Sequence, residues 1–288
     1  MKFAVAFANT GPFVQPDALA NLGIRAEEAG FESLWTVEHV LVPVGYTAEY
    51  PYSSDGKMPG TEENPIPDPV LPLAFLAAVT KTLRLATGVM ILPQRHPAYV
   101  AKEIATLDVL SKGRAIFGVG VGWLHEEFAA LGVSFDDRGS RTKESVEAIR
   151  SLWSPGAQSF EGKFFNWGPV ESNPKPVQAG GVPIVVGGHT VLAAKRAARY
   201  GNGFFPARAN AKQLKELLEA MHAECKRLDR DPSEIEITTA LPGLDFDRIK
   251  ELADMGVSRF VIGPPGKDEK SVMDGLAQFG DGIIAKFN

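Results

Sequence analysis

The chain has 288 residues and a formal net charge of −5, with 44% hydrophobic and 23% charged residues, a composition typical of a soluble globular protein. The acidic balance argues against a basic surface for nucleic acid, and no apolar run reaches the about 18 residues of a membrane span. A single cysteine, Cys225, excludes an internal disulfide, and no early segment resembles a signal peptide. We therefore expect a cytoplasmic protein that acts on small molecules.

The chain repeats one pattern, a short apolar strand followed by an amphipathic helix. Strands are predicted at residues 2–7, 33–37, 83–92, 114–119, 183–186, 203–205, 235–240 and 259–262. Helices are predicted at residues 16–29, 68–80, 97–110, 123–131 with 141–153, 191–200, 211–228, 245–255 and 270–279. Eight such units are the number that closes a (β/α)8 TIM barrel, and such barrels run to about 250 residues as one domain. We expect one domain over residues 1–288.

Two segments do not fit the repeat. Residues 40–67 follow the second strand and are rich in Pro, Gly, Tyr, Ser and Asp. A loop of this length in a compact domain is commonly a lid or a binding loop, and the alternative is a solvated surface excursion. Residues 159–178, before the fifth strand, alternate aromatic residues around Glu161–Gly162, which predicts a small hairpin packed on the barrel.

Active sites of this fold lie at the carboxyl ends of the strands. These positions carry no lysine for a Schiff base, no nucleophilic serine in an elbow, and no group of His and carboxylates dense enough for a metal ion. They carry glycines and a few imidazoles instead. Such an inventory suits an enzyme whose cofactor supplies the chemistry.

The fourth strand ends in glycines on alternate positions, Gly118, Gly120 and Gly122, followed by Trp123. Glycines at a strand end let the backbone approach something flat or phosphorylated. The alternative is a tight strand-to-helix turn inside an ordinary core. The place of this strand within the barrel series favours a ligand.

A phosphate site is predicted after the fifth strand. Gly187 and Gly188 free the backbone, and Thr190 stands as the N-cap of the next helix, so that amide groups and the helix dipole converge there. His189 lies between them, and Arg208, just past the sixth strand, offers a charged donor. The alternative is an ordinary strand-to-helix turn, which also favours Gly and Thr.

Several segments together resemble the bacterial luciferase-like monooxygenase superfamily. They are SLWTVEH at 33–39, the run from TGVMILPQRHP at 87–97 through GVGVGW at 118–123, PKPVQ at 174–178 and PIVVGG at 183–188. The resemblance implies a (β/α)8 barrel that binds FMN or its deazaflavin relative, coenzyme F420, as a homodimer. The segments YPYSSDG and NPIPDP are most similar to the F420-dependent branch.

The resemblance also implies roles for residues of the site. His39 matches a histidine that lies near the reactive ring, where it orients a ligand or transfers a proton, and Glu38 stands where many members have Asp. The alternative for His39 is a supporting imidazole that does not touch the ligand. A non-proline cis peptide is implied beside the ring, at Gly88–Val89. The residues expected to contact the cofactor are Gly88, Val89, Gly120, Gly122, Trp123, Gly187, Gly188, His189, Thr190 and Arg208.

The function that these features favour is hydride transfer between coenzyme F420 and an organic substrate. Sugar-phosphate dehydrogenases of the family have a carboxylate where this chain has Trp123, so an apolar substrate is favoured. Two alternatives stay open. One is a two-component FMN monooxygenase that uses reduced flavin from a separate reductase, and the other is a flavin-binding protein without turnover. In each case Tyr46, Tyr50 and Tyr52 of the loop at 40–67 are expected to close over the cofactor.

Overall fold

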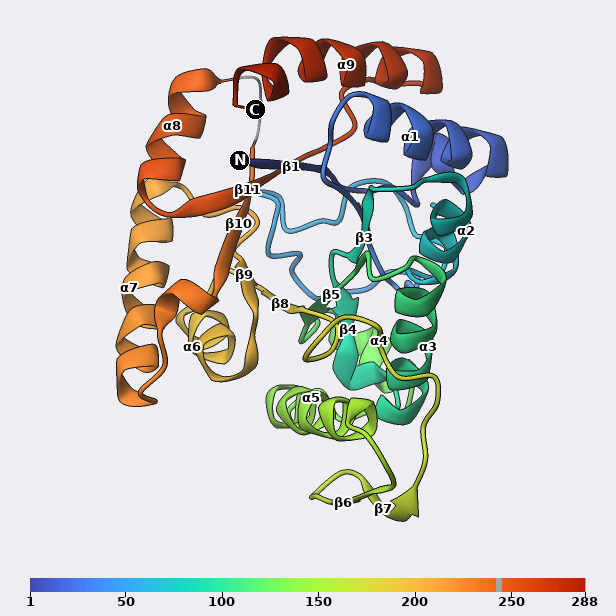
Figure 1. Cartoon of the computed structure of the whole chain (residues 1–288), viewed down its shortest axis with the longest axis vertical. Helices are drawn as coiled ribbons and strands as arrows, with labels where there is room; N and C mark the ends of the chain where they lie inside the picture. The colour runs from blue at the N-terminus through green and yellow to red at the C-terminus, as the bar shows by residue number, and fades with distance from the viewer. Residues whose placement is uncertain (242–244, 288) are drawn as a thin grey trace.

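A computed structural model describes residues 1–241 and 245–287; residues 242–244 and 288 of the predicted domain lie outside the described residues. Parallel strands form a closed barrel in the order β3-β2-β1-β11-β10-β9-β8-β5, which the pairing of β3 with β5 completes (Figure 1). Beyond β3, the short β4 pairs with the end of β5. The bounds are β1 (Lys2–Val5), β2 (Ser33–Thr36), β3 (Arg84–Thr87), β4 (Met90–Ile91), β5 (Ala115–Gly120), β8 (Ile184–Gly187), β9 (Gly203–Phe205), β10 (Glu236–Ala240) and β11 (Val257–Ile262). The predicted (β/α)8 barrel is confirmed.

Helices surround the barrel (Figure 1). They are α1 (Pro16–Glu28), α2 (Leu71–Val79), α3 (Pro97–Leu110), α4 (His125–Ala130), α5 (Arg138–Trp153), α6 (Val191–Tyr200), α7 (Ala211–Arg227), α8 (Phe246–Asp254) and α9 (Glu269–Gly282). Short 3-10 turns cover residues 11–14, 92–94, 232–234 and 284–286. Within the described part of the chain, no helix is long and apolar enough to cross a membrane.

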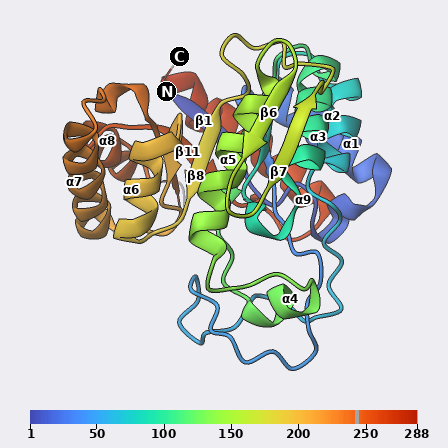
Figure 2. The same cartoon turned by 90° about the horizontal axis from the view of Figure 1, so that it is seen from below.

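Three helix starts differ from the prediction by two or more residues, and one of them is α5, which begins at Arg138 and not at Arg141. The second helix begins at Leu71, two residues after the predicted opening at Pro69. The predicted capping by Asp68 is present, because its carboxylate accepts hydrogen bonds from the amides of Val70 and Leu71 (2.8 and 3.2 Å). Helix α4 begins at His125, which leaves Trp123 in the loop after β5. The predicted hairpin is present as the antiparallel pair β6 (Gln158–Glu161) and β7 (Asn166–Val170), which lies outside the barrel beside α5 and α3 (Figure 2).

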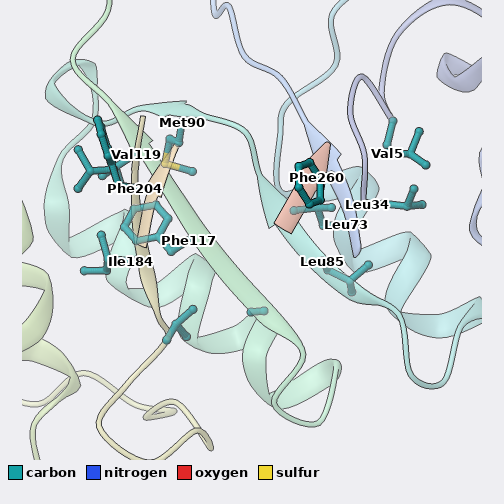
Figure 3. Packing of buried hydrophobic residues seen from close by; sticks show 14 of the residues in the cluster. Val5, Leu34, Leu73, Leu85, Met90, Phe117, Val119, Ile184, Phe204 and Phe260 are labelled. Carbon is teal, nitrogen blue, oxygen red and sulfur yellow. The ribbon is translucent and has the colours of Figure 1, made fainter. Parts of the chain in front are cut away.

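The core has two layers. The larger one lies between strands and helices and includes the side chains labelled in Figure 3, among them Phe117, Ile184 and Phe204. The inner layer fills the barrel with Trp35, Phe205 and small neighbours, and the rings of Trp35 and Phe205 lie 5.2 Å apart, edge to face. On the amino-terminal side the buried Arg259 donates to both oxygens of Glu32 (2.8 and 2.9 Å), so that its charge is compensated.

The alternating glycines make room for the segment between β3 and β4. The Gly88–Val89 peptide is cis, as predicted. A Cβ atom on Gly120 would lie 2.6 Å from one methyl group of Val89, and a Cβ on Gly187 would lie 2.7 Å from the other. The Val89 side chain therefore occupies the space that both glycines leave, and the contact of these glycines with a cofactor stays a prediction.

Of the alternating glycines at the end of β5, Gly118 has the least space, because a Cβ atom there would lie 1.9 Å from the backbone oxygen of Thr87. We predict that Gly118→Ala lowers the free energy of unfolding by about 2 to 3 kcal/mol or more, since backbone must move to admit the methyl group. Urea unfolding followed by circular dichroism measures this. The control is Gly168→Ala in β7, where a Cβ meets nothing within 4 Å and the change should stay within about 0.5 kcal/mol. Equal unfolding midpoints for the two variants would contradict this account of the glycine series.

Candidate active site

His39 follows β2 at the carboxyl end of the barrel and is paired with Glu127 of α4. The distance from His39 Nδ1 to Glu127 Oε2 is 3.0 Å, and the Glu127 side chain is fully buried. The other carboxylate oxygen, Oε1, accepts the amide hydrogens of Val40 and Leu41 at 2.7 and 3.1 Å. With Nδ1–H donating to the carboxylate, Nε2 of His39 is a proton acceptor.

Glu127 is negatively charged at neutral pH. Burial raises the pKa of its carboxyl, but the hydrogen bonds from the His39 ring and the Leu41 amide oppose burial, and the net pKa is lowered. Sequence reasoning missed this residue, which is 88 positions from His39. The available signal was the pair of carboxylates, Glu126 and Glu127, in the first turn of the helix after the glycine run.

Glu38 points away from His39. Its buried carboxylate accepts the Ile91 amide at 2.5 Å and both Nε and Nη2 of Arg95, at 2.8 and 2.5 Å. Burial raises the pKa of Glu38, and the charge of Arg95 opposes that shift. Arg95 also donates to Asp68 at 2.9 Å. Glu38 thus fixes the chain that follows β3 and β4, which argues against the catalytic role predicted for it.

Trp123 stands beside His39, as the strand-end position predicts. Its ring lies edge to face with that of His39, with centroids 5.7 Å apart. On the other side it meets two tyrosines of the loop at residues 40–67, Tyr46 at 5.6 Å and Tyr50 at 5.2 Å. The imidazole of His39 therefore contacts the Glu127 carboxylate and the aromatic ring of Trp123.

The loop continues across the barrel mouth to β8. The Tyr52 ring lies 5.4 Å from that of Tyr50 and 4.9 Å from that of His189. Arg208, after β9, donates a hydrogen bond to the Tyr52 carbonyl. The loop thus joins the ends of β5, β8 and β9, as a lid would, and its motion on ligand binding stays a prediction.

The same short helix that supplies Glu127 also holds the middle of this loop. Glu126 Oε1 accepts hydrogen bonds from the Thr47 amide, the Thr47 hydroxyl and the Ala48 amide, at 2.6, 2.9 and 3.1 Å. Burial raises the pKa of Glu126, but these donors outweigh it and lower the pKa to about 2. The loop and α4 lie together, below the barrel in Figure 2.

The turn after β8 fits a phosphorylated flat cofactor. Gly188 has φ +128°, which a side chain rarely adopts, and the Thr190 hydroxyl caps α6 by accepting from the Ala193 amide at 3.2 Å, as predicted. His189 Nδ1 is buried and has no hydrogen-bond partner among the described residues. Burial lowers the pKa of His189, so its imidazole is neutral near pH 7 and available to a ligand.

The family model described as luciferase-like monooxygenase matches residues 3–243. This chain belongs to the luciferase-like monooxygenase family. An uncharacterised family relative from Mycobacterium tuberculosis is 32% identical over 300 residues, which cover 99% of this chain and 100% of the relative. An F420-dependent glucose-6-phosphate dehydrogenase of Kineococcus radiotolerans is 31% identical over 238 residues, 81% of this chain and 65% of the relative.

A solved structure extends the likeness of this luciferase-family chain to the whole fold. The monooxygenase RslO1 from Streptomyces bottropensis superposes with a TM-score of 0.79 at 25% identity and covers 100% of both chains. The family and the barrel are therefore shown, whereas the relatives differ among themselves in the cofactor and reaction that their names state.

The docking of the loop on Glu126 should depend on pH. Its pKa is about 2 in the folded protein against an ordinary 4.5, so the carboxylate stabilises the docked loop fully above about pH 4.5, and the effect is lost as the pH falls toward 2. We expect faster hydrogen exchange of the Thr47 and Ala48 amides, relative to intrinsic rates, at pH 3 than at pH 6.

Glu126→Gln should show the faster exchange already at pH 6 and should lose most of the pH dependence. The matched control is Glu63→Gln in the same loop, a side chain with no hydrogen bond among the described residues. If Glu126→Gln exchanges as slowly as the control at pH 6, Glu126 does not hold the loop.

Proposed function

We propose that this protein is an oxidoreductase that transfers hydride between coenzyme F420 and a fairly apolar organic substrate. The observation that carries the proposal is the His39–Glu127 pair beside Trp123 at the mouth of a luciferase-family barrel. The F420-dependent relative, 31% identical over most of this chain, supports this cofactor. The turn after β8 and Arg208 would hold its phosphate end.

His39 is assigned the proton that accompanies the hydride. Coenzyme F420, when bound, supplies the carbon that accepts or donates hydride. In the oxidative direction the substrate loses a hydride to the cofactor and a proton to Nε2 of His39, and in the reductive direction both return. Glu127 keeps Nδ1 protonated and stabilises the imidazolium that forms, as a buried carboxylate does for a general base.

Trp123 supports an apolar substrate. The residues that meet it, His39, Tyr46 and Tyr50, offer ring edges and no guanidinium or ammonium group. The nearby cation Lys57, whose Nζ lies 5.0 Å from the centre of the Tyr46 ring, belongs to the loop and not to the residues around Trp123. An apolar group therefore suits the position beside Trp123 better than a phosphate does, and glucose 6-phosphate is not proposed as the substrate of this chain.

The second candidate is a monooxygenase that uses reduced FMN and oxygen. It is favoured by the likeness to the monooxygenase RslO1, which covers the whole chain. In this case His39 would again accept or donate a proton, and a separate reductase would supply the reduced flavin. A flavin-binding protein without turnover would show neither reaction.

Titration of the purified protein with F420 and with FMN, read from cofactor absorbance, distinguishes these functions. We expect F420 to bind at least about tenfold more tightly than FMN, a difference of about 1.4 kcal/mol. Tight FMN binding with oxygen consumption by reduced FMN, and no binding of F420, would replace the proposal by the monooxygenase.

The role of His39 gives a second test. His39→Ala should lower turnover by about 10²-fold, the range for a lost general acid or base, while the dissociation constant of the cofactor changes little. Glu127→Gln should also lower turnover, by about tenfold or more, since Nδ1 loses its carboxylate. Arg208→Ala should mainly weaken cofactor binding. His222→Ala, an exposed histidine on α7, is the control and should leave both quantities unchanged. Intact turnover in His39→Ala, or loss of cofactor binding, would refute the assigned role.

A further inference from the structure

Asn9 is a fully buried polar residue at the barrel mouth to which the proposed reaction gives no part. It follows β1, which pairs in parallel with β2, so it lies next to the segment that leaves the end of β2. Phe7 has φ +59°, which bulky residues rarely adopt, and turns the chain at this point. The Ala8 amide still donates to the Trp35 carbonyl at 3.1 Å, and beyond it a side chain continues the contact with the β2 segment.

The carboxamide of Asn9 uses both of its polar atoms. Nδ2 donates to the carbonyls of Val37 and Pro67, each at 2.9 Å, and Oδ1 accepts the amide hydrogen of Val37, also at 2.9 Å. The side chain thus bonds to Val37 as the backbone of a neighbouring strand would. Its orientation is fixed, because only the nitrogen can donate to the two carbonyl oxygens.

These bonds hold the two ends of the loop at residues 40–67 together. Val37 lies just before the loop and Pro67 is its last residue, yet the side chain of Asn9 reaches both. The Thr36 hydroxyl supports the same arrangement by donating to the Pro69 carbonyl at 2.8 Å. Movement of the loop on ligand binding would therefore take place between two fixed ends.

The backbone of His39 lies between two fixed points. On one side Asn9 binds both the amide and the carbonyl of Val37, two residues earlier. On the other side the Glu127 carboxylate accepts the amide hydrogens of residues 40 and 41. The segment that carries the imidazole is therefore held from β1 and from α4 at the same time.

We propose that Asn9 is a positioning residue of the active site, which fixes the place of His39 by holding both ends of the loop at residues 40–67. The proposal rests on the function proposed above, because the proton transfer assigned to His39 needs a fixed imidazole. Only the carboxamides of Asn and Gln offer two N–H donors and an acceptor in one group. An aspartate has the same shape but no donor when ionised, so it would place a negative charge against two carbonyl oxygens.

Hydrogen exchange measured by nuclear magnetic resonance on the isotope-labelled full chain tests the proposal without turnover. In the unaltered protein, both protons on Nδ2 of Asn9 should exchange at least about tenfold more slowly than those of the exposed Asn202. In Asn9→Asp, the proton on His39 Nδ1 and the amides of residues 40 and 41 should exchange at least about tenfold faster than in the unaltered protein, because the preceding backbone is released.

Asn202→Asp is the matched control. The side-chain oxygen of Asn202 accepts the Ile184 amide at 3.0 Å, a role that a carboxylate keeps, and the residue precedes β9, away from the barrel mouth. The same substitution there should leave the exchange of the His39 proton unchanged. Asn9→Ser, which keeps one hydroxyl donor and adds no charge, replaces Asn9→Asp where the aspartate variant does not fold.

Turnover gives a readout that a purely structural role would not change. Per folded molecule, kcat should fall by about tenfold or more in a variant of Asn9, while the dissociation constant of the cofactor changes less than about threefold. The proposal is overturned if the Nδ2 protons of Asn9 exchange as fast as those of Asn202. It is also overturned if a folded variant of Asn9 keeps the exchange rates and the kcat of the unaltered protein.

Failure of the proposed function would be seen separately. If the unaltered protein has no turnover with either cofactor, the function is wrong, but slow exchange at His39 in the unaltered protein and fast exchange in the variant of Asn9 would still establish that Asn9 positions this imidazole.

Discussion

One large side chain, Trp35, sets the geometry of the barrel interior. A small eight-stranded barrel must be filled by side chains, and here one fully buried indole packs among smaller neighbours such as Ala4 and Ala86. Gly88 follows the neighbouring strand β3, and a Cβ atom there would lie 2.7 Å from the indole. Arg259 lies toward its other side, 5.8 Å from the ring. Val89 packs against the buried cluster that contains Trp35. Trp35 thus supports the segment between β3 and β4 from inside the barrel.

The fold could be predicted where local signals are strong. The helices at 97–110 and 191–200 have the predicted bounds because each is preceded by a residue whose side chain caps it, His96 and Thr190. The predicted start of α2 was too early. The Asp68 carboxylate accepts hydrogen bonds from the amides of Val70 and Leu71, and the helix begins only at Leu71, which the order of residues in the sequence does not reveal. The glycines of β5 predicted that another group approaches the backbone closely, but they did not indicate which residue does so. Val89 comes from the segment between β3 and β4, and which strands are neighbours is known only once the barrel closes.

The sequence predicted only those residues of the site that closely follow a strand. His39 and Trp123 were found in this way, and the structure brings them together. Glu127 was missed because its partnership with His39 depends on how the loop at 40–67 crosses to α4. The partner of Glu38 was missed for a similar reason, since the arginine that donates to its carboxylate is 57 positions away, and the catalytic role of Glu38 stays a prediction. Such tertiary pairs leave no periodic signal in the sequence.

The carboxylate of Glu127 has one further consequence. One of its oxygens accepts hydrogen bonds from the first two amides of the loop, and the other is paired with His39. A single carboxylate therefore contacts both the loop backbone and the imidazole. If residues 40 and 41 were displaced, the carboxylate would lose the hydrogen bonds from their two amides, and its hydrogen bond with the His39 ring would change. The backbone at the start of the loop and the His39 imidazole are therefore coupled through one buried carboxylate.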